Sequence, residues 1–302
     1  MATVTERLTD LGYAAGWAAV RALPEPVART LFRAGADVAA RRQDENSQLR
    51  RNLSRVLGVA PADVPDDLVR DALRSYARYW REAFRLPSTD HEAVAREMDR
   101  TIDGVEHLDA ALEKGRGAVV ALPHSANWDR GGTWLARRYG TFATVAERLK
   151  PESLYQRFLA YREGLGFTII PHSGGGTPPL ARLEEFLAGG GVVCLLGERD
   201  LRRTGVPVTF FGEPTRMPAG PARLAVQTGA PLLVAEFWYQ DKESMRVRIH
   251  PPIDVSGGIE AATQAMADTF AAGIARHPED WHMLQPLWLD DLPADRRAHL
   301  GG

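Results

Sequence analysis

A histidine and a carboxylate flank a predicted turn between a strand and a helix. The apolar, β-branched run from Ala118 to Leu122 predicts a buried strand, and Pro123 ends it before a helix predicted over 128–138. His124 and Asp129 would not face each other on one helix, but across a turn the carboxylate can reach the imidazole. Such a pair makes a general base whose ring is oriented by the acid. A capping turn with an incidental histidine explains the same residues.

Three more titratable side chains follow later predicted strands. Glu147, His172 and Glu198 each come directly after an apolar run. Because ligands of open α/β sheets bind at the carboxyl ends of the strands, we expect several of these residues to lie near His124. Each of them alone is also explained as a solvated loop charge. Together they predict a site at one edge of the sheet.

Other chemistries have weaker support in the sequence. The single Cys194 excludes an internal disulfide and a C-x-x-C metal site, and its apolar run predicts a buried, inert thiol. The chain has no H-E-x-x-H spacing, so we expect no metal ion. It has no G-x-S-x-G elbow either, which disfavours a serine hydrolase.

Composition is that of a globular protein with an ordinary core. The 302 residues are 44% hydrophobic and 25% charged, with a net charge of −2. A chain without a basic excess is not expected to bind nucleic acid. No apolar run reaches the roughly 18–20 residues that span a bilayer, and the start of the chain lacks the basic region of a secretory signal. We therefore expect a cytoplasmic location, free or at a membrane surface.

The hydrophobic pattern changes near residue 100. Before it, the sequence predicts helices over 8–23, 26–42 and 68–84; after it, strands and helices alternate. We predict an α/β fold, a central mostly parallel sheet flanked by helices, with the helical region 1–100 packed on the core 101–302 as a single domain. The predicted strands are 118–122, 141–146, 166–170, 191–197, 206–211, 231–239 and 244–250. The predicted helices of the core are 128–138, 152–164, 178–188, 218–228 and 259–276.

The first two predicted helices are amphipathic. Over 8–23 and 26–42, apolar residues lie to one side, and in the second helix arginines lie to the other. This pattern suits a helix lying on an anionic membrane, and it equally suits a helix packed on its own domain. Both interpretations stay open at the level of the sequence.

Four stretches taken together carry a family resemblance. HSANWD, VAERL, LLGERD and TFFGEPTRMPAGPARLA resemble the lipid A acyltransferase-like branch of the bacterial lysophospholipid acyltransferase superfamily. That branch carries an H-x4-D/E motif, an acidic residue after the next strand, and a P-x-x-F-F-G block followed by G-x-x-x-L-A. Glu198, in a place where aspartate is common, and the altered ending 281–288 look most like the mycobacterial enzymes that acylate phosphatidylinositol mannosides.

The resemblance implies a reaction and its place. It implies transfer of palmitoyl from palmitoyl-CoA to the 6-hydroxyl of the mannose on the 2-position of inositol, in phosphatidylinositol mono- and dimannosides. The acceptor lies in an anionic membrane surface, so the enzyme would be peripheral on the cytoplasmic face of the plasma membrane. His124 would be the general base with Asp129 beside it. Acyl-CoA is a co-substrate, and no other cofactor is implied.

The remaining site residues are expectations of the same resemblance. Glu147 and Glu198 would orient the catalytic network or hydrogen-bond the mannose, and Arg162 and His282 would line the acceptor groove. Three alternatives stay open: an acyltransferase with another glycolipid or lysophospholipid acceptor, an acyl-CoA thioesterase, and a lipid-binding protein without catalysis.

Overall fold

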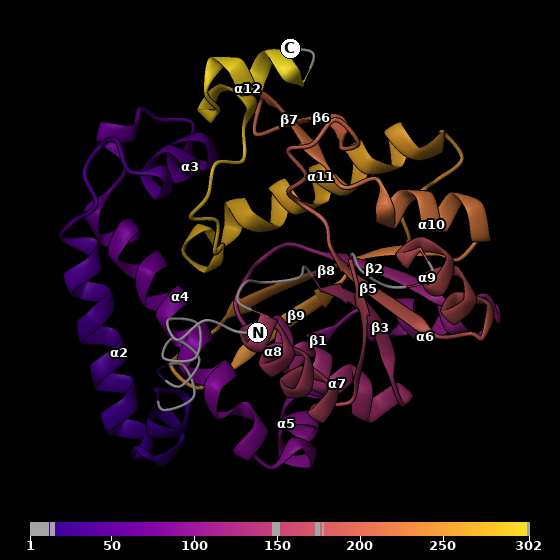
Figure 1. Cartoon of the computed structure of the whole chain (residues 1–302), viewed down its shortest axis with the longest axis horizontal. Helices are drawn as coiled ribbons and strands as arrows, with labels where there is room; N and C mark the ends of the chain where they lie inside the picture. The colour runs from indigo at the N-terminus through magenta and orange to yellow at the C-terminus, as the bar shows by residue number, and fades with distance from the viewer. Residues whose placement is uncertain (1–11, 13–15, 147–151, 173–175, 177, 301–302) are drawn as a thin grey trace.

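The fold is built on a seven-stranded sheet, in a computed structural model that describes residues 12, 16–146, 152–172, 176 and 178–300. The strand order is β1-β9-β8-β2-β5-β3-β4, and every pair is parallel except β8 with β9 (Figure 1). The predicted α/β fold with a mostly parallel sheet is confirmed. The strands are β1 Ile102–Asp103, β2 Ala118–Leu122, β3 Phe142–Ala146, β4 Phe167–Pro171, β5 Val192–Leu196, β8 Leu232–Tyr239 and β9 Met245–Ile249.

Two layers of helices cover the sheet, with a separate apolar core on each face. Side chains alternate between them, so that Val120 belongs to one core and its neighbour Val119 to the other. Figure 1 shows α5, α7 and α8 on one side of the sheet and α10 and α11 on the other. The helices of the core are α5 His91–Met98, α6 Val105–Leu112, α7 Trp128–Tyr139, α8 Glu152–Gly164, α9 Pro179–Ala188, α10 Gly220–Thr228 and α11 Gly258–Arg276.

Two glycines let α7 approach the sheet closely. A Cβ on Gly131 would lie 2.4 Å from the Phe237 ring, and a Cβ on Gly132 would lie 2.4 Å from the Phe167 ring. No side chain fits at that distance, so the sequence Gly-Gly in the middle of this helix is explained by packing rather than by helix propensity.

The predicted strand 206–211 forms, but it is not part of the central seven-stranded sheet. β6 (Val206–Phe210) pairs only with β7 (Glu213–Met217), which the sequence pattern missed, and the two form a separate antiparallel hairpin. Phe211 and Gly212 between them have φ values of 50° and 79°. Two consecutive residues with positive φ are typical of a two-residue hairpin turn, which pairs adjacent strands with each other.

The N-terminal region is helical and packs beside the sheet, as predicted. It contains α2 Glu25–Ala40, α3 Gln48–Leu57 and α4 Asp66–Arg85. The sequence pattern missed α3, although Ser47 caps its start and Gly58, with a φ of 68°, ends it. Residues 16–22 are also helical, and most of the rest of the first predicted helix lies outside the described residues. The remaining helices are α12 Ala294–His299 and the 3-10 turns Pro61–Asp63, Leu86–Ser88, Pro278–Asp280 and Leu289–Asp291.

Candidate active site

His124 is hydrogen-bonded to a buried glutamate at the carboxyl edge of the sheet. β2 and β5 are neighbours, so His124 and Glu198, which follow them, lie side by side. Oε1 of Glu198 is 2.6 Å from Nδ1 of the His124 ring and accepts the backbone N–H of His124, also at 2.6 Å. Glu198 has no exposed surface, while the His124 side chain is 35% exposed. A neutral ring that donates its Nδ1–H to a carboxylate in a hydrogen bond presents its unprotonated Nε2 as a base.

The backbone around His124 is fixed by the segment 280–282. The N–H of Ala126 donates to the carbonyl of Asp280 at 2.9 Å, and the N–H of His282 donates to the carbonyl of His124 at 2.7 Å. Ala126 has a φ of 46°, in the left-handed region that non-glycine residues seldom adopt. The two hydrogen bonds hold this turn in place, and with it the direction of the His124 side chain.

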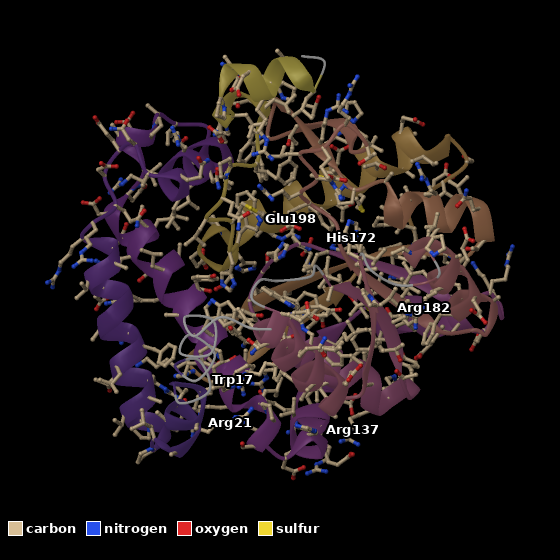
Figure 2. The ribbon with its side chains drawn as sticks, in the orientation of Figure 1. Trp17, Arg21, Arg137, His172, Arg182 and Glu198 are labelled. Atoms are coloured by element: carbon tan, nitrogen blue, oxygen red, sulfur yellow. The ribbon has the colours of Figure 1, made fainter. Side chains whose placement is uncertain are left out.

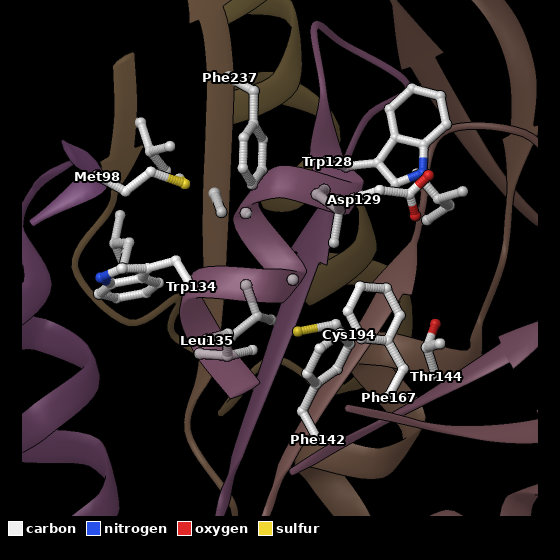
Figure 3. A pocket seen from close by; sticks show the side chains of 18 of the residues that line it. Met98, Trp128, Asp129, Trp134, Leu135, Phe142, Thr144, Phe167, Cys194 and Phe237 are labelled. Carbon is white, nitrogen blue, oxygen red and sulfur yellow. The ribbon is translucent and has the colours of Figure 1, made fainter. Parts of the chain in front are cut away.

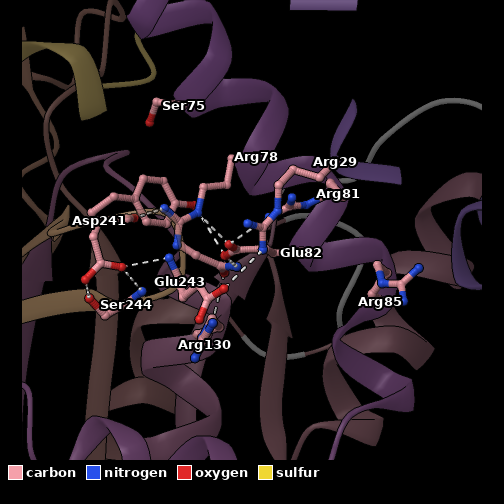
Figure 4. Close-up of polar contacts among 12 residues, drawn as sticks. Arg29, Ser75, Arg78, Arg81, Glu82, Arg85, Arg130, Asp241, Glu243 and Ser244 are labelled. Carbon is pink, nitrogen blue, oxygen red and sulfur yellow. Dashed lines mark hydrogen bonds and ion pairs between the residues drawn. The ribbon is translucent and has the colours of Figure 1, made fainter. Parts of the chain in front are cut away.

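Asn127 joins the same turn to α4 and to α7. Its side-chain oxygen caps α7 by accepting the N–H of Arg130 at 3.1 Å, and its Nδ2 donates to Glu82 at 3.0 Å. Glu82 also accepts a 2.6 Å hydrogen bond from Arg78, in the polar cluster that Figure 4 draws between α4 and α7. Burial raises the pKa of Glu82, but Arg78 and Arg130 outweigh it and bring the pKa below its ordinary value. The charged carboxylate therefore anchors the start of α7.

Asp129 makes contacts that differ from the predicted one. Its buried carboxylate accepts hydrogen bonds from Arg162 Nε at 3.1 Å, Tyr79 at 3.1 Å and Tyr161 at 3.4 Å. Among the described carboxylates, it is Glu198 that is hydrogen-bonded to His124. The physical reason is that α7 begins at Trp128, which directs the Asp129 side chain toward α4 and α8 rather than back over the turn.

Asp129 and Arg162 form an ion pair in which the carboxylate is buried and the Arg162 side chain is 21% exposed. Burial lowers the pKa of Arg162, but the Asp129 carboxylate more than reverses this and the pKa ends above its ordinary value. Burial and the same carboxylate raise the pKa of Tyr79 well above its usual range, so its hydroxyl remains a donor. These groups hold α4, α7 and α8 together beside the site.

Two other predicted site residues, Glu147 and His172, are not seen in contact with His124. Glu147 lies outside the described residues, so the structure does not place it. In the view of Figure 2, His172 lies toward α9 and α10 from Glu198. Its exposed ring has Nε2 3.0 Å from Nη1 of Arg202. His172 therefore contacts a surface arginine.

His282 lies beside His124. The ring is buried among aromatic rings, with centroid distances of 5.4 Å to Tyr76, 5.8 Å to Tyr79 and 6.2 Å to Trp128. Sequence reasoning did not single out Ser75, which hydrogen-bonds this ring. Ser75 lies among the aromatic residues of α4, and this position gives no distinguishing pattern in the sequence.

An apolar cavity runs between α7 and the sheet. Figure 3 shows its walls, where Thr144 and Asp129 are polar and most other side chains are apolar. Arg162 is a further polar residue of the lining. Side chains from the strands form its floor: Val120, Leu122, Phe142, Phe167, Leu196, Ala235, Phe237, Val247 and Ile249. Cys194 also lines it, and burial raises the pKa of this thiol, so that it stays protonated. The cavity suits an aliphatic chain.

The family follows from comparison with known proteins. The family model described as bacterial lipid A biosynthesis acyltransferase matches residues 2–290. This chain belongs to that family. It is 59% identical over 299 residues to the phosphatidylinositol mannoside acyltransferase of Mycobacterium tuberculosis (strain H37Rv), covering 99% of this chain and 94% of that protein. It is 58% identical over 296 residues to the protein of the same name from Mycolicibacterium smegmatis, covering 98% and 96%.

In this acyltransferase, the histidine and the cavity meet at Trp128. The Trp128 ring lies edge-on to the His124 ring at 5.3 Å and also lines the cavity. A base beside a residue that lines an apolar cavity can act on a hydroxyl that attacks the head of an acyl chain bound there. The sequence motif and the geometry therefore indicate the same reaction class.

Proposed function

We propose that this acyltransferase moves palmitoyl from palmitoyl-CoA to the 6-hydroxyl of the mannose on the 2-position of inositol in phosphatidylinositol mono- and dimannosides. The observation that carries the proposal is the His124–Glu198 pair at the apolar cavity. The choice of acceptor is supported by relatives that are named phosphatidylinositol mannoside acyltransferase and match nearly the whole chain.

In the proposed mechanism His124 is the general base. Its Nε2 takes the proton of the mannose hydroxyl while the hydroxyl oxygen attacks the thioester carbon. The carboxylate of Glu198 stabilises the imidazolium that forms. When the tetrahedral intermediate collapses, the carbon–sulfur bond breaks, and the CoA sulfur takes the proton from His124. Because CoA is already a good leaving group, no covalent enzyme intermediate is needed.

The cavity supplies the binding energy for the acyl chain. A palmitoyl group has about 15 methylene and methyl groups beyond its carbonyl, each worth about 0.8 kcal/mol on transfer from water. The acyl chain gains this free energy only when it binds in an apolar site. Glu147, Arg162 and His282 are proposed to contact the mannose or to orient the groups that do; Arg162 would act through its ion pair with Asp129.

A membrane surface is the proposed place of the reaction. One face of α2 packs against α4 through Ala28 and Ala36, while Val27, Leu31 and Val38 point outward with 43%, 56% and 48% exposure. Both interpretations of the amphipathic pattern thus have support in one helix. Within the described part of the chain, every helix is too short or too polar to span a bilayer. We propose peripheral binding to the cytoplasmic face of the plasma membrane.

The exposed apolar face of α2 gives a test of membrane binding. Replacing the three residues together (Val27→Ser, Leu31→Ser and Val38→Ser) is expected to reduce flotation with vesicles of phosphatidylcholine and phosphatidylinositol by about tenfold, because apolar insertion is lost. Val226→Ser is the matched control, since Val226 is a 40% exposed valine on α10. Equal flotation of the triple variant and wild type, or no binding of wild type at low salt, would argue against docking through α2.

The reaction is tested with radiolabelled palmitoyl-CoA. The purified protein is incubated with the donor alone, with phosphatidylinositol dimannoside, and with a lysophospholipid. We expect label in the dimannoside only. Label in the lysophospholipid would contradict the proposed acceptor, free palmitate without an acceptor would indicate a thioesterase, and no turnover of the donor would indicate a lipid-binding protein.

A further inference from the structure

A buried hydrogen-bonded chain that the mechanism does not use leads to His282. Ser75 Oγ lies 2.6 Å from Oδ1 of Asp280 and 2.9 Å from Nε2 of His282. The other oxygen of Asp280 accepts the backbone N–H of Tyr239 at 2.7 Å. Ser75 lies on α4, on the helix that also carries Arg78 and Glu82 (Figure 4). All three members of the chain are more than nine-tenths buried.

The carboxylate at one end of this series of hydrogen bonds decides which group donates in each of them. As a carboxylate, Asp280 has only acceptors, so the single hydroxyl proton of Ser75 is donated to it. The Ser75 oxygen is then left to accept, and His282 must supply the proton from Nε2. The ring stays neutral, because burial and the neighbouring His124 lower its pKa to about 3. Nδ1 of His282 is therefore an acceptor without a proton.

We propose that Ser75 and Asp280 are positioning residues that fix His282 in its neutral Nε2–H tautomer, leaving Nδ1 to accept a hydroxyl of the sugar acceptor. This proposal depends on the proposed function for its substrate, although the tautomer itself does not. His282 lies where such a contact matters, because its backbone N–H is bonded to His124 and its ring lies beside Trp128.

The state of Nδ1 supports a ligand role. It is buried and has no hydrogen-bond partner within the described ranges. An unpaired buried polar atom costs about 1–3 kcal/mol, and a donor from the substrate removes that cost. A hydroxyl that donates to His282 keeps its own oxygen free for other contacts in the groove. In the opposite tautomer, Nδ1 would carry a proton and offer no acceptor.

Asp280→Asn tests the proposal sharply because it should reverse the donor and acceptor roles along these hydrogen bonds. The asparagine oxygen would accept the Tyr239 N–H, and its amide would donate to Ser75. The Ser75 hydroxyl would then donate to Nε2 of His282 and force the Nδ1–H tautomer. Ser75→Ala removes the link altogether and leaves the tautomer unfixed. Ser54→Ala is the matched control, since Ser54 is a buried helical serine whose hydroxyl donates to the carbonyl of Arg51 in its own helix.

The experiment is nitrogen-15 NMR of the full chain labelled on histidine, with the His282 signals identified by their loss in His282→Gln. It is run at pH 8.5, where Asp280 is ionised even though burial raises its pKa to about 7. We expect the Nε2–H tautomer in wild type and in Ser54→Ala, the Nδ1–H tautomer in Asp280→Asn, and a mixture in Ser75→Ala. The KM for the glycolipid should rise about tenfold in Asp280→Asn and Ser75→Ala, with the KM for palmitoyl-CoA unchanged.

The NMR outcomes decide the tautomer, and the KM for the glycolipid decides the contact with the sugar hydroxyl: an unchanged KM in folded Asp280→Asn and Ser75→Ala would overturn that contact. A wild-type His282 that is charged or carries its proton on Nδ1 would overturn the proposal. So would the same tautomer in wild type and a folded Asp280→Asn, or a fixed Nε2–H tautomer in Ser75→Ala. If instead the proposed function is wrong, wild type will transfer no acyl group to the glycolipid, while the tautomers can still be as expected.

Discussion

Replacing His124 with alanine is expected to lower the rate of acyl transfer by about 10²- to 10⁴-fold, the range that a general base contributes. The substitution removes the ring whose Nδ1 is hydrogen-bonded to Glu198 and whose Nε2 is proposed to take the proton. The rate constant kcat is measured with palmitoyl-CoA and phosphatidylinositol dimannoside at saturation. Loss of the acyl transfer step, rather than of binding, should leave the KM for palmitoyl-CoA close to wild type.

His172→Ala is the matched control for this variant. His172 also follows a strand of the sheet, but its ring is exposed and contacts Arg202, so its loss should change kcat less than twofold. Thermal unfolding of both variants shows whether the fold survives. A folded His124→Ala enzyme that keeps a tenth of wild-type kcat would remove His124 from the role of base.

The general architecture was predictable because it follows from local patterns. The five predicted helices of the core and the sheet strands 118–122, 166–170 and 191–197 occur within a few residues of their predicted bounds, since apolar runs and periodicity specify them. The short elements α5, α6 and β1 were not predicted. The pairing of β6 with β7 was not predictable from apolar content. It depends on the two-residue turn at 211–212, where Phe211 takes an unusual positive φ.

The site was predicted in its location but not in its pairing. The sequence placed His124 and Glu198 at strand ends, and the order of β2 and β5 made them neighbours across 74 residues of chain. Asp129 was predicted as the partner of His124 because it is close along the chain. Its actual partner, Arg162, is brought by α8, and packing between helices has no signal in local spacing.

The hydrogen-bonded chain to His282 was beyond the reach of sequence reasoning for the same reason. Ser75 and Asp280 are 205 residues apart and meet only because α4 packs against the turn at 278–280. A serine among aromatic residues on a helix has no distinguishing pattern. Its role comes from the carboxylate and the imidazole that the folded chain places on either side of its hydroxyl.

Glu198→Gln is expected to lower kcat by about 10²- to 10³-fold without changing the fold. The glutamine oxygen can still accept from the backbone and ring of His124, so the geometry is kept and only the charge is lost. Without that charge, the imidazolium formed during attack loses the stabilisation that it receives from a fully buried carboxylate, where electrostatic interactions are stronger than in water. The kcat is measured against pH, together with urea unfolding of each variant.

Asp129→Asn separates this role from a structural one. The same loss of one carboxylate charge leaves the largely buried Arg162 without its counter-ion, which costs about 3–5 kcal/mol of unfolding free energy. We therefore expect Asp129→Asn to lower stability strongly and kcat per folded molecule modestly, and Glu198→Gln to do the reverse. If Asp129→Asn were stable and the more damaging of the two to kcat, the acid that assists His124 would be Asp129, and Glu198 would only hold the turn. The two carboxylates thus differ in what their charge stabilises. The charge of Asp129 stabilises the folded state, and the charge of Glu198 stabilises the protonated form of His124.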